Sequence, residues 1–284
     1  MSSTTLAPGP GTVEVPGGDL AYEVLPGSSR PVLAVHGISS HRRLWLWLRE
    51  AAPELALVAP DLRGRADSVD VAGPSSPERH ADDLALLLDH LGLDAVPVVG
   101  MSMGGFVAVQ LATRHPARVE SLVLVDGGFP MATPPGLTPE AVEAVFADRV
   151  GRLGRTWASA DEYLDYFCST APLLDRDDPL LRTYVEHDLR DGRVRLSTEA
   201  LVADATSIFF DEVPWRDVAV PVRFLHAEWG TGRDSAPAYP PEAVERYAAV
   251  AQTVVGVEGV DHAGSIMSPR GAAATAALTR EALA

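Results

Sequence analysis

Three features of the sequence predict an α/β fold, built on a mostly parallel sheet with helices on both faces. Short apolar runs typical of buried strands alternate along the chain with segments of helical periodicity. One apolar run ends abruptly at Gly100–Gly104, which has the pattern GxSxG of a strand that turns sharply into a helix. A long segment without strand alternation, residues 129–213, predicts an inserted helical cap.

The first part of the chain predicts a hairpin followed by alternating strands and helices. Residues 1–11 are expected to form a flexible tail, and residues 12–15 and 20–24 to pair across a turn. Ser76 followed by Pro77 has the signature of a helix N-terminus. The other elements predicted here are strands at 31–35, 55–59, 95–99 and 121–125 and helices at 41–51, 77–91 and 106–114.

The sheet is predicted to resume after the cap. Apolar strands are expected at 221–226 and 253–257, with a helix near 241–250 between them and an alanine-rich helix at 269–283. The predicted core therefore consists of residues 12–128 and 214–284. In sheets of this kind, ligands bind at the carboxyl ends of the strands.

The composition excludes several classes of function. With 46% hydrophobic and 22% charged residues, and no apolar run near the roughly 20 residues that cross a bilayer, the chain is not expected to enter a membrane. A single cysteine, Cys168, offers neither a disulfide nor a metal cluster, and no secretory signal is evident, so we expect a cytoplasmic protein.

The charges are equally informative. A net charge of −16 argues against a nucleic-acid partner, because phosphate binding depends on clustered cations. Every basic residue apart from histidine is arginine, so Schiff-base chemistry, pyridoxal phosphate and a Ser-Lys pair have no candidate residue. We predict no cofactor and no metal, and the sequence carries no signal for an oligomeric state.

Ser102, at the centre of the GxSxG pattern, is the candidate nucleophile. A serine hydroxyl is a poor nucleophile at neutral pH, so it needs a base and a third group that orients the base. Of the eight histidines, His262 lies in the loop after the last predicted strand and is the leading candidate. His36 precedes a glycine-rich loop and is better explained by a structural role.

Four stretches in this order resemble the α/β-hydrolase fold family: His36–Ile38, Asp61–Ser68, Gly100–Gly105 and Asp261–His262. The resemblance spans nearly the whole chain and includes the cap. It implies an oxyanion hole made by the backbone N–H groups of Ile38 and Met103. The second stretch is usually written DxRGxGxS in this family, and here alanine replaces its second glycine.

The acid of the triad departs from the family's common form. Most members place it in a GxxD pattern after the strand that corresponds to residues 222–226, but Gly230 occupies that position here. Asp126, which ends the strand after the Ser102 motif, stands where some members carry the acid and is our first choice. Glu228 and Asp234 remain alternatives.

The resemblance and these residues predict a serine hydrolase that cleaves small carboxylic esters. The same machinery suits thioesters and lactones. A carbon–carbon bond hydrolase of the same fold remains open, as does a non-hydrolytic ligand-binding protein. Epoxide hydrolases and haloalkane dehalogenases of this family use an aspartate at this position, so Ser102 argues against both activities.

Overall fold

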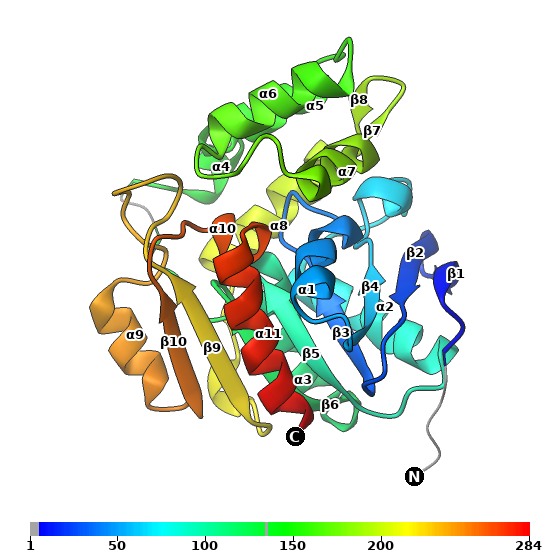
Figure 1. The fold of residues 1–284 in the computed structure, drawn as a ribbon, viewed down its shortest axis with the longest axis vertical. Helices are drawn as coiled ribbons and strands as arrows, with labels where there is room; N and C mark the ends of the chain where they lie inside the picture. Colours follow the sequence, from blue (N-terminus) through cyan, green and yellow to red (C-terminus); the bar gives the residue numbers. More distant parts are fainter. Residues whose placement is uncertain (1–5, 134–135) are drawn as a thin grey trace.

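The computed structural model describes residues 6–133 and 136–284, without the side chains of residues 147–150. Within these residues an eight-stranded sheet has the order β1-β2-β4-β3-β5-β6-β9-β10 (Figure 1). All neighbouring strands from β4 to β10 are parallel, whereas β2 is antiparallel to β1 and to β4. The strands are β1 (Gly9–Val15), β2 (Gly18–Leu25), β3 (Pro31–Val35), β4 (Ala56–Pro60), β5 (Val96–Met101), β6 (Val119–Val125), β9 (Val222–Ala227) and β10 (Thr253–Val257).

Helices cover both faces of this sheet. In Figure 1, α1 and α11 lie in front of the strands and α2 and α3 lie behind them. The helices are α1 (Leu46–Ala51), α2 (Pro77–His90), α3 (Met103–Arg114), α4 (Val142–Val145), α5 (Ala147–Gly154), α6 (Ala160–Thr170), α7 (Pro179–Asp188), α8 (Thr198–Phe210), α9 (Pro241–Ala248), α10 (Gly264–Met267) and α11 (Pro269–Leu283). The predicted architecture is confirmed.

Burial explains why the central strands are continuous apolar runs. All six residues of β5 are buried, because α3 covers one face of the strand and α11 the other. Two apolar clusters result, one on each side of the sheet, and the cluster on the α11 side continues into the cap. This rigid centre holds the loops at the carboxyl ends of the strands in place.

The segment from α4 to α8 lies over the carboxyl ends of the strands, at the top of Figure 1. It is mainly helical, as expected, but it also contains a short hairpin, β7 (Leu189–Arg190) with β8 (Arg193–Val194), which we did not predict. Its turn is Asp191–Gly192, and both residues have positive φ (52° and 69°). Asp-Gly is a strong hairpin signal, but strands of two residues are too short to show alternation.

The expected boundaries differ from the structure mainly at element ends. Strand β1 begins at Gly9, so residues 9–11 pair with β2 and do not belong to a tail. Helix α3 begins at Met103, three residues before the predicted start, directly after the candidate nucleophile. Residues 1–5 of the expected tail lie outside the described residues.

Candidate active site

Ser102 occupies a strained turn between β5 and α3. Its φ is 55° and its ψ is −121°, a conformation that L-residues rarely adopt. The Ser102 N–H donates a hydrogen bond of 2.9 Å to the carbonyl of Val125, which ties the turn to the end of β6. Ser102 is partly exposed.

Glycines allow neighbouring loops to approach Ser102 closely. A Cβ at Gly127 would lie 2.1 Å from the Ser102 carbonyl oxygen, and one at Gly37 would lie 3.2 Å from the Ser102 Cβ. A Cβ at Gly104 would lie 2.0 Å from the carbonyl oxygen of Val35. The glycines around the nucleophile are therefore required by packing between backbones.

His262 and Asp126 lie in direct contact. His262 Nδ1 is 2.6 Å from Asp126 Oδ2, and the other carboxylate oxygen, Oδ1, accepts a hydrogen bond of 3.1 Å from the Ala227 N–H. Asp126 is buried, whereas the His262 side chain is 31% exposed. A proton on Nδ1 donates to the carboxylate and leaves Nε2 free to accept a proton.

The two alternative acids lie elsewhere. Glu228 is exposed and accepts a hydrogen bond of 2.6 Å from the Gly259 N–H. Asp234 is exposed on its loop. Among the described residues, Asp126 is the carboxylate that contacts His262, and no hydrogen bond joins His262 to Ser102.

The loop that starts at His36 packs beside the nucleophile. His36 Nδ1 donates to the Gly37 carbonyl at 2.8 Å, and His36 Nε2 accepts from the Leu62 N–H at 3.0 Å. Complete burial is the main reason why the pKa of His36 falls to about 4, so the ring is neutral. The peptide whose oxygen His36 binds also carries the Ile38 N–H.

Met103 begins helix α3 beside the same loop. The first N–H groups of a helix have no intrahelical acceptor, so the Met103 N–H is available to an oxygen atom near Ser102. The Ile38 N–H has no acceptor among the described residues. Of the two N–H groups that the resemblance implies as oxyanion donors, that of Ile38 is on the loop after β3 and that of Met103 is at the first residue of α3.

Two arginines that sequence reasoning did not single out donate hydrogen bonds to this loop, and an aspartate binds one of them. Arg65 donates to the Ile38 carbonyl, Arg152 donates to the Ser39 carbonyl, and Asp204 forms an ion pair with Arg65. All three are buried. The sequence could have indicated Asp204, because an acidic residue on the apolar face of a helix needs a buried partner.

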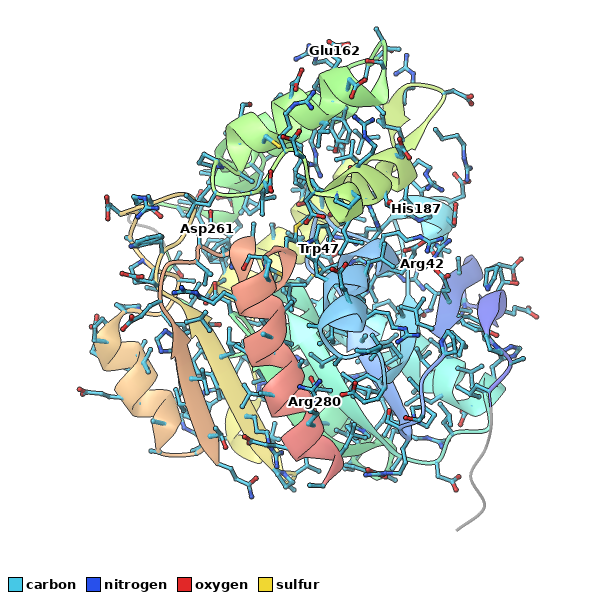
Figure 2. All side chains as sticks on the ribbon, in the orientation of Figure 1. Arg42, Trp47, Glu162, His187, Asp261 and Arg280 are labelled. Carbon is cyan, nitrogen blue, oxygen red and sulfur yellow. The ribbon has the colours of Figure 1, made fainter. Side chains whose placement is uncertain are left out.

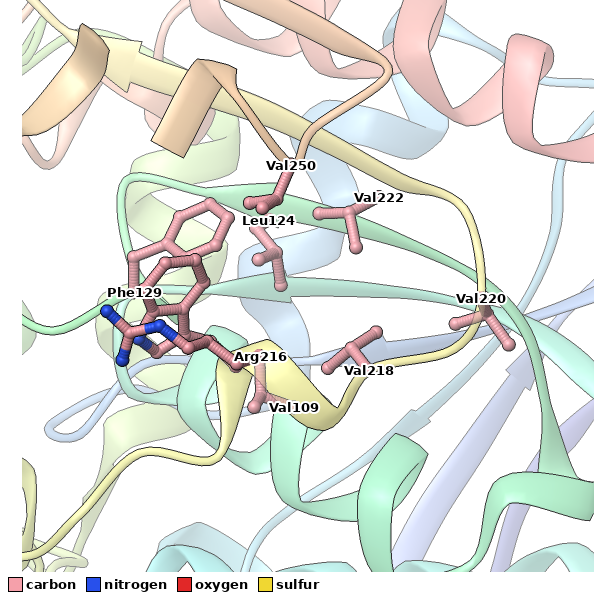
Figure 3. A pocket seen from close by; sticks show the side chains of 9 residues that line it. Val109, Leu124, Phe129, Arg216, Val218, Val220, Val222 and Val250 are labelled. Carbon is pink, nitrogen blue, oxygen red and sulfur yellow. The ribbon is translucent and has the colours of Figure 1, made fainter. Parts of the chain in front are cut away.

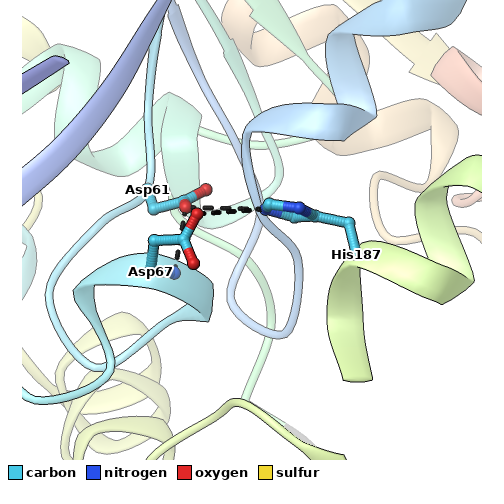
Figure 4. Close-up of side chains that lie close together, drawn as sticks. All are labelled: Asp61, Asp67 and His187. Carbon is cyan, nitrogen blue, oxygen red and sulfur yellow. Dashed lines mark hydrogen bonds and ion pairs between the residues drawn. The ribbon is translucent and has the colours of Figure 1, made fainter. Parts of the chain in front are cut away.

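Asp61, Asp67 and His187 form an acidic cluster where the cap meets the core (Figure 4). Arg42 binds both carboxylates, and Arg195 also binds Asp67. Burial alone would raise the pKa of Asp67, but its bonds to these guanidinium groups lower it to about 2. Figure 2 shows Arg42 and His187 close together. The cluster is a neutralised ion-pair network that joins cap and core.

An apolar cavity of about 80 Å³ lies on the α3 side of the sheet, away from these residues (Figure 3). Val109, Phe129 and Trp215 are among the side chains that line it. It is smaller than the several hundred Å³ of typical ligand pockets. None of the residues around Ser102 lines it, so it has no part in the candidate site.

Known proteins resemble this chain over most of its length. The chain is 33% identical to Lipase LipV of Mycobacterium tuberculosis over 69% of its length and 71% of the relative. It is 28% identical to a putative 2-succinyl-6-hydroxy-2,4-cyclohexadiene-1-carboxylate synthase of Bacillus subtilis over 72% of its length and 75% of the relative. In the part of the chain that the structure describes, no helix is long and apolar enough to cross a membrane.

Solved structures share the fold over nearly the whole chain. E-2-(acetamidomethylene)succinate hydrolase superposes with a TM-score of 0.74 at 25% identity, covering 92% of this chain and 94% of that one. A thermophilic esterase from Thermogutta terrifontis gives 0.70 at 25% identity, covering 97% and 99%. The model of the alpha/beta hydrolase family matches residues 32–278. With its eight-stranded sheet and its serine in the strained turn after β5, the chain belongs to the alpha/beta hydrolase family.

Proposed function

We propose that this protein is a cofactor-independent serine hydrolase that cleaves carboxylic esters. The observation that carries the proposal is the 2.6 Å contact between His262 Nδ1 and the buried carboxylate of Asp126, next to a serine held in a strained turn. This is the relation of base and acid that activates a serine. The names of the relatives, which include a lipase and an esterase, support the same reaction class.

Each residue has a role in two half-reactions. His262 Nε2 takes the proton of Ser102 Oγ while Oγ bonds to the ester carbonyl carbon, and Asp126 stabilises the resulting imidazolium. The N–H groups of Ile38 and Met103 bind the oxyanion. His262 then gives the proton to the leaving alcohol as the C–O bond breaks. Water, activated by His262, hydrolyses the acyl-enzyme and restores Ser102.

The missing hydrogen bond between Ser102 and His262 is compatible with this sequence of steps. Catalytic hydrogen bonds are often long in enzymes without substrate and shorten in the complex. The partly exposed His262 ring makes its side-chain hydrogen bond through Nδ1, so Nε2 is left for the nucleophile.

A labelling experiment combined with a substrate panel tests this function. We expect a fluorophosphonate probe to label Ser102, and expect Ser102→Ala to abolish both labelling and turnover of short aryl and alkyl esters. Thioesters and lactones belong in the panel because the same steps cleave them. The proposal is wrong if the wild-type protein resists the probe, or if Ser102→Ala keeps its activity.

A further inference from the structure

Three successive carbonyl groups in the loop beside Ser102 are each bound by a different buried side chain. His36 Nδ1 binds the oxygen of Gly37 at 2.8 Å, Arg65 Nε that of Ile38 at 3.0 Å, and Arg152 Nη2 that of Ser39 at 3.1 Å. We call this segment, residues 37–39, the oxyanion loop. The carbonyl groups of surface loops usually bind water. Here three consecutive carbonyl groups bind protein side chains, which indicates that these side chains fix the backbone conformation of residues 37–39.

These bonds restrict the direction of the Ile38 N–H. That N–H lies in the same planar peptide unit as the Gly37 oxygen, and the next peptide unit carries the Ile38 oxygen. With both units held, one by His36 and one by Arg65, the two backbone dihedrals of Ile38 have little freedom. Arg65 Nη2 also lies 3.9 Å from the Met103 Sδ, so the same guanidinium contacts the residue of the second oxyanion donor.

The Arg65 guanidinium is buried and makes polar contacts through all three of its nitrogen atoms. It is 1% exposed, and its polar contacts occupy all five N–H groups. Its partners are Ile38 O, Arg63 O, Ser75 Oγ, His80 Nε2, Asp204 Oδ2 and Met103 Sδ. An apolar side chain would fill this position without the cost of burying a charge, so stability alone does not explain the arginine.

Asp204, on cap helix α8, holds the other end of this guanidinium at 2.6 Å. Its Oδ2 also accepts from Ser75 Oγ at 2.9 Å and contacts His80 Nε2 at 3.0 Å. Burial raises the pKa of Asp204, but the charges of Arg65 and His80 and these hydrogen bonds lower it to about 2. The carboxylate is therefore ionised, and it anchors Arg65 from the cap.

The backbone reinforces the link between the cap and Arg65. Arg65 forms an isolated antiparallel bridge with Leu196, which leads into α8. The Ala66 N–H donates to Arg195 O at 2.7 Å, and the Ser197 N–H donates to Gly64 O at 2.8 Å. The position of Arg65 thus depends on the position of the cap.

Arg152 reaches the oxyanion loop from a second cap helix, α5. It is 6% exposed, and no carboxylate of the described residues forms an ion pair with it. Its hydrogen bond to Ser39 O is accompanied by a buried Nε that has no acceptor among the described residues. The charge of the buried Asp188 favours the guanidinium of Arg152, while the hydrogen bond to Ser39 O directs one end of this guanidinium to the loop and restricts the loop's movement.

Resting on the ester hydrolysis proposed above, we propose that Arg65 and Arg152 are positioning residues that set the oxyanion loop, and that they couple it to the cap. Arg65 binds the loop and is linked to the cap through Asp204 on α8, whereas Arg152 binds the loop from cap helix α5. The cap then contributes to the chemical step itself, because the Ile38 N–H is correctly directed only while the cap is docked on the core.

Kinetics of arginine variants test this coupling. We expect Arg65→Met and Arg152→Met each to lower kcat by about 10- to 100-fold while KM stays within about threefold, because loss of one oxyanion donor costs roughly 10²–10³ in kcat. Asp204→Asn should lower kcat in the same direction. Arg65→Lys keeps the charge but has no Nε for the Ile38 oxygen, so it should not restore the rate.

Arg63 provides a matched control two residues away. It is equally buried and equally well bonded, to Asp83, Ala72 O and Pro16 O, but it does not touch the oxyanion loop. Arg63→Met should therefore lower thermal stability without a selective loss of kcat. Arg155→Met gives the corresponding control for Arg152, because Arg155 is exposed at the end of α5.

A transition-state analogue separates positioning from general damage. A trifluoromethyl ketone adds to Ser102 Oγ and forms a tetrahedral oxyanion, so its inhibition constant should rise in proportion to the loss of kcat/KM in the Arg65 and Arg152 variants. The acid limb of the pH profile should not move, because His262 and Asp126 are untouched. Arg65→Lys carries this test if Arg65→Met does not fold.

Two results would overturn the coupling. One is a loss of kcat in Arg63→Met as large as in Arg65→Met. The other is unchanged affinity of the Arg65 and Arg152 variants for the trifluoromethyl ketone. Either result leaves the proposed function intact as long as Ser102 is labelled and required. Failure of the function itself would appear as activity in Ser102→Ala.

Discussion

At the scale of single residues, the register of two strands decides which carboxylate meets the histidine. Val125 pairs with Leu225 in the β6–β9 ladder, which brings the Ala227 N–H to Asp126 just beyond the strand. Asp126 has a φ of 45°, so its side chain leaves the strand end at an unusual angle. Short acidic side chains tolerate this conformation better than most.

Removal of the carboxylate charge should show which acid orients His262. We expect Asp126→Asn to lower kcat by several orders of magnitude, because an amide at this place favours the wrong tautomer of the ring. Ester turnover at pH 7 is the measurement, with Glu228→Gln and Asp234→Asn as controls of the same charge change. A large loss in Glu228→Gln alone would contradict the proposed triad.

The sequence favoured Asp126 as the acid but left Glu228 and Asp234 as alternatives. All three follow predicted strands of the same sheet, and sequence distance does not reveal which loop turns toward His262. The deciding contacts, such as the Ala227 N–H to Asp126, come from pairing between distant strands. The nucleophile Ser102 was easier to predict than the acid, because its motif and the strand and helix on either side are adjacent in the sequence.

Ala66 shows a different limit of sequence reasoning. The resemblance places a glycine at this position in most relatives, and the structure gives Ala66 a φ of 43°, where a Cβ is unfavourable. This chain therefore adopts a left-handed conformation at a non-glycine residue. The hydrogen bond between the Ala66 N–H and Arg195 O, on the cap side, helps to hold that conformation.

At the scale of elements, the approach of helix α3 to strand β3 depends on the absence of side chains. Gly104 lies in the first turn of α3, and its Cα faces the carbonyl groups at the end of β3. A methyl group would meet backbone atoms that cannot rotate away. The helix would have to move, and Ser102 at its N-terminus would move with it.

A pair of glycine substitutions tests this packing. We expect Gly104→Ala to lower the melting temperature by several degrees and to reduce ester turnover, because overpacking in a core costs about 1–3 kcal/mol. Gly151→Ala in α5 is the control, since a Cβ there meets nothing within 4 Å and alanine favours a helix by up to about 1 kcal/mol. Equal melting temperatures for the two variants would contradict the explanation.

Elements with strong internal patterns were predictable, and short ones were not. The strand 31–35 and the helix 269–283 have the predicted bounds, because a continuous apolar run and a Ser-Pro start are local signals. Helix α10, of four residues, was missed. It exists because Asp261 Oδ1 accepts from the Gly264 N–H within a loop that is also bound to Gly232.

At the scale of the whole molecule, buried imidazole rings should make the free energy of unfolding depend on pH. Burial lowers the pKa of His36 to about 4, and burial together with the charge of His187 lowers that of His41 well below its usual range. Between pH 6.5 and 4 the unfolded chain therefore binds more protons than the folded chain. Stability is present above about pH 6.5 and is lost as the pH falls toward 4.

Urea unfolding between pH 7 and 4.5 measures this effect. Each neutral buried histidine should contribute a slope of up to about 1.4 kcal/mol per pH unit. His41→Asn preserves an acceptor for the Arg43 N–H at the start of the 3-10 turn and removes the titration, so the slope should become less steep. An unchanged slope in this variant would show that His41 does not titrate on unfolding.

The placement of the acid on β6 has a consequence for the order of folding. Ser102 and Asp126 belong to one β–α–β unit, Val96–Asp126, whose pairing requires only a local right-handed crossover. His262 is separated from Asp126 by 136 positions in the sequence and arrives with the C-terminal segment. Contacts of such long range form late, since loop closure must precede them. In refolding, the nucleophile and the acid can therefore reach their native spacing well before the base docks and catalysis begins.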